Sequence, residues 1–239
     1  MTFMYGQTNG LTGKGFGTMD GAPRDVATPP ALLDAAIIKT SDIQAGTASP
    51  CGRTILSGKI DMKKALDKAE DGGLPDVGTN GRIKLVAHVI NPKGSGPFTC
   101  AIDTSADGNN FATIPVTVNV PANAAPGGKP IDYSLEAQLP QGTKCSGGAD
   151  GQSCIVKCTN ALSSGGCMAF TQMQGLFNDP APAGSGPSPG SETERITENP
   201  VTRDSNLFDD ARSKLSPKDL QALTPPAKGK RRALIQMRR

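Results

Sequence analysis

The cysteines are the feature that most constrains how this chain can fold. There are six of them, all in the middle of the sequence: Cys51, Cys100, Cys145, Cys154, Cys158 and Cys167. An even number without any Cys-x-x-Cys pair is typical of a disulfide framework, whereas a structural zinc site shows short paired spacings and more histidines. We therefore expect three disulfides and maturation in an oxidising compartment.

The spacing of the cysteines suggests one pairing and leaves the other two open. Cys145 and Cys154 flank the glycine-rich stretch SGGADGQS, which can fold back and bring their Cα atoms to roughly 4.4 to 6.8 Å, as a disulfide requires. Cys51 and Cys100 would then pair with Cys158 and Cys167 in either of two arrangements. Cys154 and Cys158, four residues apart on a predicted strand, should share one face of it.

The rest of the composition restricts location and partners. The start of the chain, MTFMYGQTNGLTGKGFG, lacks the basic and apolar regions of a signal peptide. An extracellular or cell-surface location, expected from the cysteines, therefore has a cytoplasmic alternative. No apolar run reaches the roughly 20 residues of a membrane helix, so we expect no membrane span. The net charge of +3 does not indicate a nucleic-acid partner for the whole protein.

Apolar alternation with a period of two predicts a mainly β body over residues 1–175. It runs through the segments RIKLVAHVI, FTCAID, FATIPVTVNV, DYSLEAQLP, CIVKC and CMAFTQ, which predict about six strands in a sandwich or barrel. In the third segment, Ile114, Val116, Val118 and Val120 should share one face, and Pro115 indicates a strand edge or a bulge. The first thirty residues show no helical period, and the next segment, PPALLDAAIIKTSDIQAG, indicates a short helix or turn leading into a strand. One short helix is expected near Asp61 to Glu70.

The composition changes after Gln172. Residues 176–239 contain no cysteine and many proline, glycine, serine and glutamate residues, and they end in KGKRRALIQMRR. This composition predicts a disordered linker followed by a basic tail. That tail is either simply solvated or contacts an anionic polysaccharide, lipid or nucleic acid.

The sequence contains no complete set of catalytic motifs. A Ser-His-Asp constellation cannot be assigned from its one histidine, His88, and GLTGKGFG lacks the Ser or Thr that completes a phosphate-binding loop. Nothing in the sequence pairs two carboxylates as a glycosidase requires.

Several segments, in order, resemble the fungal Egh-like family, which includes the appressorium-specific Gas and Mas proteins. They are DGAPRD, AAIIKTSDIQAGTASPCGRTILSGKIDM, VAHVINPKGSGPFTCAID, LPQGTKCSG, CIVKCTNAL and GCMAFTQ. The resemblance covers about Thr8 to Gln172. It implies a secreted virulence-associated protein of infection structures, in which the cysteines, His88 and the GSGPF turn at Gly94 to Phe98 are shared features. Two family cysteines after the PRD segment are missing here, which suggests that they form one bridge with each other.

Members of this family in turn look distantly like copper-dependent lytic polysaccharide monooxygenases. That likeness implies a disulfide-stapled immunoglobulin-like β-sandwich, in which a mature N-terminal histidine binds copper and His88 corresponds to the second ligand. This chain begins at Met1, near where that histidine would lie. Along its own strand, His88 should share a partly apolar surface with Val86, Ile90 and Lys84. One imidazole binds copper weakly, because affinity requires several nitrogen donors at fixed geometry.

Two classes of function follow from these expectations. The first is a non-enzymatic virulence factor without a cofactor, acting in appressorium-mediated host penetration on a host surface or on cell-wall polysaccharide. The second is a copper-dependent enzyme acting on cell-wall polysaccharide, with His88 as one ligand and the N-terminal histidine missing from this chain. The absence of a complete catalytic set favours the first class.

Overall fold

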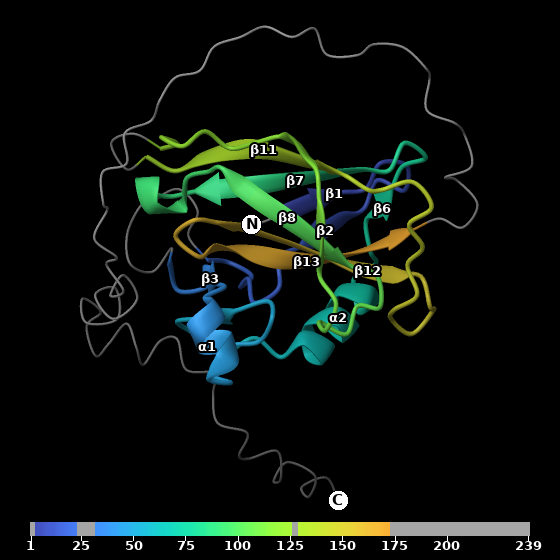
Figure 1. Ribbon diagram of the computed structural model, residues 1–239, viewed down its shortest axis with the longest axis horizontal. Coiled ribbons are helices and arrows are strands. Elements are labelled where there is room, and N and C mark those ends of the chain that lie inside the picture. Colours follow the sequence, from blue (N-terminus) through green and yellow to red (C-terminus); the bar gives the residue numbers. More distant parts are fainter. Residues whose placement is uncertain (1–2, 23–31, 126–128, 173–239) are drawn as a thin grey trace, which may run out of the picture.

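Two β-sheets packed face to face form the body of the protein (Figure 1). The structure is a computed structural model that describes residues 3–22, 32–125 and 129–172. Within these residues there are thirteen strands and two α-helices. A mainly β body is thus confirmed, whereas the immunoglobulin-like arrangement of its strands stays a prediction.

The first sheet has five strands in the order β10-β11-β7-β1-β2, all antiparallel. They are β10 (Val116–Val118), β11 (Ile131–Gln138), β7 (Arg82–Val89), β1 (Phe3–Tyr5) and β2 (Thr12–Lys14). The two long strands are paired over their full length, from Arg82 opposite Gln138 to Val89 opposite Ile131. The short strand β1 therefore lies in the interior of this sheet, next to β7.

The second sheet has eight strands, and its long central strands hold the remaining apolar segments. Its order is β5-β4-β3-β13-β12-β8-β9, with β6 parallel to β13. The strands are β3 (Ala36–Ile37), β4 (Arg53–Thr54), β5 (Gly58–Lys59), β6 (Asp76–Val77), β8 (Phe98–Asp103), β9 (Ala112–Ile114), β12 (Ser153–Asn160) and β13 (Ser164–Gln172). Consecutive strands β12 and β13 form a hairpin at its centre.

Alternating apolar residues from both sheets form the main core between them. The first sheet contributes Met4, Ile83, Leu85, Ala87, Val89, Leu135 and Ala137, and the second contributes Cys100, Ile102, Ile114, Cys154, Val156, Cys158, Met168 and Phe170. Each of these side chains is at most 5% exposed. Because side chains along a strand alternate between its two faces, the period-two pattern of the sequence becomes this double layer.

A second, smaller core covers the other face of the eight-stranded sheet. Helix α2 (Met62–Asp71) begins at Asp61, whose carboxylate caps it by accepting a hydrogen bond from the Lys64 backbone N–H at 3.1 Å. The helix places Leu66 in a cluster with residues of β12, β13 and the preceding loops, and both helices lie on this side of the molecule in Figure 1. The predicted short helix is confirmed, and helix α1 (Thr40–Gln44) lies in the segment that indicated a short helix or turn.

The N-terminal residues form a β-hairpin that the sequence did not indicate. Strand β1 pairs with β2, and the connection between them is held by the buried Asp76 of β6, whose carboxylate accepts hydrogen bonds from the backbone N–H groups of Thr8 and Asn9 and from the Thr8 hydroxyl. The pairing of β1 with β7 and the contacts of Asp76 join residues about 70 to 80 positions apart. A local pattern could not reveal this hairpin, because tertiary contacts stabilise it.

The segment FATIPVTVNV is divided at Pro115 between the two sheets, so the expected single strand is wrong. Strand β9 pairs with β8 in the second sheet, whereas β10 pairs with β11 at the edge of the first. The expected common face is lost as a result: Ile114 and Val120 are buried, but Val118 is 42% exposed. Proline cannot donate a ladder hydrogen bond, so the strand ends where the chain changes sheets.

The predicted linker and basic tail, residues 176–239, lie outside the described residues, and so does the boundary at residue 175. No helix among the described residues is long and apolar enough to span a membrane.

Candidate functional site

His88 lies on β7, on the side of the five-stranded sheet that faces away from the main core. Directly opposite it on β11 is Asp132, and the His88 Nδ1 atom lies 2.6 Å from the Asp132 Oδ1 atom. The His88 side chain is only 10% exposed, whereas that of Asp132 is 65% exposed. The pair therefore joins a nearly buried imidazole to a solvated carboxylate.

The other nitrogen of His88 has no such partner. Its Nε2 atom is buried and makes no hydrogen bond with the described residues. With Nδ1–H donating to Asp132, a neutral imidazole presents a lone pair at Nε2. A carboxylate bound to one ring nitrogen is also the arrangement that orients metal-bound histidines. Chemically, His88 is therefore suited to serve as a single oriented nitrogen ligand.

The surroundings of His88 differ in part from the sequence expectation. Val86 and Lys84 do lie on the outward alternation of β7 with His88, but Ile90 follows the end of the strand and is buried. Asp132 was missed, because pairing across strands depends on a register that the sequence pattern leaves undetermined. In the sequence, the sign of a partner for His88 was the acidic side chain of Asp132 itself, near the start of the segment IDYSLEAQ.

Copper does not fit the described residues alone. They include no group of three or more His, Cys, Asp or Glu side chains that could hold a metal ion, and His88 contributes a single nitrogen. One feature does bear on the N-terminal ligand of the copper hypothesis: Phe3 of β1 stands opposite Val86 in an antiparallel pairing. Followed backward from Phe3, the direction of β1 points along β7 toward His88.

All six cysteines are paired, and each pair stabilises a different part of the body. Cys100 and Cys158 join β8 to β12 within the main core, at a Cα separation of 4.1 Å. Cys51 and Cys167 join the loop before β4 to β13 in the smaller core, with 5.5 Å between their Cα atoms. This is one of the two arrangements left open by the sequence. Cys154 and Cys158 share the inner face of β12, as their spacing predicts.

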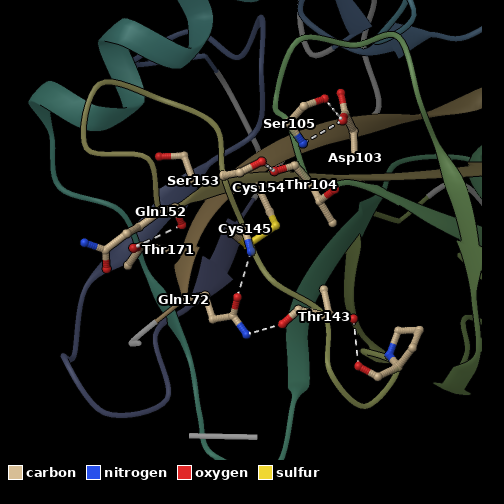
Figure 2. The surroundings of a disulfide bond; sticks show 12 residues. Asp103, Thr104, Ser105, Thr143, Cys145, Gln152, Ser153, Cys154, Thr171 and Gln172 are labelled. Atoms are coloured by element: carbon tan, nitrogen blue, oxygen red, sulfur yellow. Dashed lines mark hydrogen bonds between the residues drawn. A yellow bond between two sulfur atoms is a disulfide. The ribbon is translucent and has the colours of Figure 1, made fainter. Parts of the chain in front are cut away.

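The third disulfide joins Cys145 to Cys154, nine residues later at the start of β12. Cys154 lies opposite Phe170, close to the end of β13. Gln172 extends from that strand end to the disulfide: its side chain accepts a hydrogen bond from the Cys145 backbone N–H at 2.8 Å and donates one to the Thr143 carbonyl at 2.6 Å. Figure 2 shows both contacts beside the sulfur atoms. The short loop is thereby attached to the second sheet.

The GSGPF turn, residues 94–98, connects several elements. It follows the short 3-10 helix η2 (Pro92–Gly94) and leads into β8. The Asn160 side chain of β12 donates hydrogen bonds to the carbonyls of Lys93 and Ser95, at 3.1 and 2.6 Å. A Cβ atom at Gly96 would lie 1.9 Å from the Val120 carbonyl oxygen, so only glycine permits this approach. These contacts indicate a structural role for the turn.

Comparison with known proteins gives one family. The family model described as "Egh16-like virulence factor" matches residues 1–167. The appressoria-specific virulence factor GAS2 of Pyricularia oryzae is 27% identical over 231 positions, which cover 69% of this chain and 80% of GAS2. The appressoria-specific virulence factor GAS1 of the same fungus is 30% identical over 164 positions, which cover 65% of this chain and 63% of GAS1. No solved structure matches the chain.

Proposed function

Because this chain belongs to the Egh16-like virulence factor family, we propose that it is a secreted fungal factor that supports host penetration without catalysing a reaction. Family membership is the observation that carries the proposal, since it supports a virulence-associated role for the chain. Both similar proteins are named as appressoria-specific virulence factors, which favours a role in the infection structure itself.

The three disulfides support the extracellular part of this proposal. Such bridges form and persist in oxidising compartments and are rare in the cytosol. Two of them lie within the hydrophobic cores, where Cys51, Cys100, Cys158 and Cys167 are at most 1% exposed. A chain that kept six thiols would leave both cores without their covalent links.

The structural contacts of the potentially reactive side chains support the proposal that the protein is not an enzyme. The cysteines are bridged, the buried Asp103 accepts hydrogen bonds from the backbone N–H groups of Ser105 and Gly108, and the buried Asp76 anchors the N-terminal hairpin. These groups already have structural partners, so each would have to give up a contact in order to react.

Deleting the gene in the source fungus and scoring penetration of host tissue tests the proposed role. We expect fewer successful penetrations, rescue by the wild-type gene, and equal rescue by genes carrying His88→Ala or Asp132→Ala. Immunoblots of the extracellular fluid would establish that each protein is secreted at a normal level. If the His88→Ala protein is abundant outside the cell but fails to rescue, the non-enzymatic proposal is wrong. Unimpaired penetration by the deletion strain would reject the role itself.

The buried Nε2 atom of His88 favours a second candidate, the copper-dependent enzyme. It requires a mature form that begins with a histidine able to reach His88, since the described residues supply one nitrogen ligand only. The test compares copper binding by the chain starting at Met1 with that of a form whose processed N-terminus is histidine, each with and without His88→Ala. Calorimetry and the electron paramagnetic resonance spectrum report binding directly. This candidate predicts tight one-to-one binding only when both histidines are present, and its absence from the histidine-started form would reject it.

A further inference from the structure

The outward-facing side chains of β1, β2, β7 and β11 form a regular surface, here termed the outer face. The strand register fixes their neighbours. Tyr5 stands between Thr12 of β2 and Lys84 of β7, and Lys84 is in turn opposite Glu136 of β11. In the next row, Phe3 stands between Lys14 and Val86, and Val86 is opposite Ser134. Two aromatic rings thus follow one another along β1, and the Tyr5 ring has a polar side chain on each side.

Tyr5 is unusually accessible for an aromatic residue on an interior strand. It is 49% exposed, although β1 has a neighbouring strand on each side. An aromatic ring presents an apolar plane together with a polar hydroxyl group, and both are available to a ligand lying across the sheet. The adjacent Thr12 and Lys84 are also exposed and can provide hydrogen bonds at the edge of such a ligand.

The charges of the outer face nearly balance one another. The face carries three cations, Lys14, Arg82 and Lys84, and two carboxylates, Asp132 and Glu136. A third carboxylate, Asp20, lies beyond β2 and pairs with both Lys14 and Lys68. Lys14 pairs with Asp20, and the Arg82 Nη1 atom lies 3.4 Å from the Glu136 Oε2 atom. Complementary potentials favour association and like charges oppose it. A face with so little excess charge therefore favours a neutral polar partner over a polyanion.

We propose that the outer face binds a neutral cell-wall polysaccharide, with a sugar ring stacked on Tyr5. A pyranose ring has an apolar face of C–H groups and an edge of hydroxyl groups, which matches an aromatic plane bordered by Thr12 and Lys84. Phe3, two residues along β1, provides a second apolar contact for a chain of sugars. This inference rests on the proposed function in one respect only, which is that the protein meets cell-wall polysaccharide outside the cell.

The test is depletion of the purified full chain from solution by insoluble cellulose, a neutral β-linked glucan, measured over a range of cellulose concentrations. We expect Tyr5→Ala to weaken binding by roughly tenfold or more, the scale of losing one well-placed aromatic contact. Tyr5→Phe retains the ring and should bind nearly as well as the unmodified protein. The matched control is Leu162→Ala, because Leu162 is 59% exposed and lies in the turn between β12 and β13, away from the outer face.

Thermal unfolding of each variant would establish that it is folded. No depletion by cellulose would overturn the proposal, and so would equal depletion of the Tyr5→Ala and unmodified proteins. Preferential binding to polygalacturonate, abolished by salt and unchanged by Tyr5→Ala, would instead assign recognition to positive charge. Penetration assays separate the two ideas: cellulose binding without a penetration defect in the deletion strain rejects the proposed function alone, and a defect without cellulose binding rejects this inference alone.

Discussion

At the scale of single residues, Asp76 shows how one buried carboxylate determines a distant part of the fold. It is 1% exposed and accepts hydrogen bonds from Thr8 and Asn9, in the connection between β1 and β2. Burial alone would raise the pKa of Asp76, but the hydrogen bonds from Thr8 and Asn9 outweigh it and hold the pKa below its usual value. The ionised form is therefore the one that stabilises the hairpin.

This pKa shift predicts a loss of stability in acid. A carboxylate whose pKa is lower in the folded state contributes stability above its unfolded pKa of about 3.9, and that contribution disappears as the pH falls through the folded pKa. Asp76→Asn should therefore lower the free energy of unfolding at pH 7 by about 2 kcal/mol, with a smaller difference from the unmodified protein below pH 4. Urea unfolding from pH 7 to pH 3 measures both effects.

The control for this prediction is Asp150→Asn, which changes an exposed carboxylate in the Cys145–Cys154 loop. Because this side chain is exposed, the substitution should change the free energy of unfolding by less than about 0.5 kcal/mol. A constant difference between the Asp76→Asn and unmodified proteins across the whole pH range would contradict the assignment to Asp76.

At the scale of secondary-structure elements, helix α2 was predicted well because its signals are local. Asp61 caps its first turn, and Gly72 follows its last residue, Asp71. Its apolar residues recur at helical spacing, so one face is directed onto the second sheet. Helix α1 was indicated only as a short helix or turn, because it is a five-residue element without a buried side chain. The sequence predicted only part of the division at Pro115, since proline indicated a strand edge or a bulge but not that the chain would change sheets.

Removing the apolar contact of α2 should weaken the smaller core. Leu66 is 8% exposed and belongs to that cluster, so Leu66→Ala should lower the free energy of unfolding by about 2 to 4 kcal/mol. The control is Lys63→Ala in the same helix, where the Lys63 side chain is 83% exposed and pairs with Asp67 at 3.1 Å. It should cost less than about 0.5 kcal/mol. Equal urea midpoints for the two variants would show that α2 does not pack as described.

At the scale of the whole molecule, the disulfides close loops of very different lengths. Cys51–Cys167 spans 116 residues and attaches the loop before β4 to β13, whereas Cys145–Cys154 spans nine and closes a local loop. The conformational freedom that a bridge removes from the unfolded chain grows with the logarithm of the loop length. The long bridge should therefore contribute more to stability than the short one.

Replacing each disulfide by two alanines tests this order. The chain-entropy relation predicts a loss of about 4.8 kcal/mol for the Cys51–Cys167 pair and about 2.6 kcal/mol for the Cys145–Cys154 pair. Thermal and urea unfolding of the two double variants measure the difference, and mass mapping would establish that the remaining bridges are native. Greater destabilisation on removing the short bridge would contradict this order and would indicate that packing around Gln172 and Cys145 outweighs loop closure.

The candidate site divides in the same way between what the sequence shows and what it does not. His88 could be selected from the sequence because it is the one histidine of the chain. Its bond to Asp132 and the burial of its Nε2 atom depend on the register of β7 against β11 and on what covers the strand. The outer face around Tyr5 could not be predicted for the same reason. The N-terminal sequence carries no strand pattern of its own, and β1 forms by pairing with β7.

By itself, the sequence determined the mainly β body, the position of α2, the paired state of the cysteines and the family, because each of these depends on local periodicity, composition or a motif. Only the tertiary structure decided which strands share a sheet, which cysteines pair with Cys51 and Cys100, and which side chains lie next to His88 and Tyr5. The physical reason is that alternation specifies which residues face inward, but many pairings satisfy the same alternation. The pairing adopted here depends on long-range contacts such as those of Asp76 and the 116-residue link from Cys51 to Cys167.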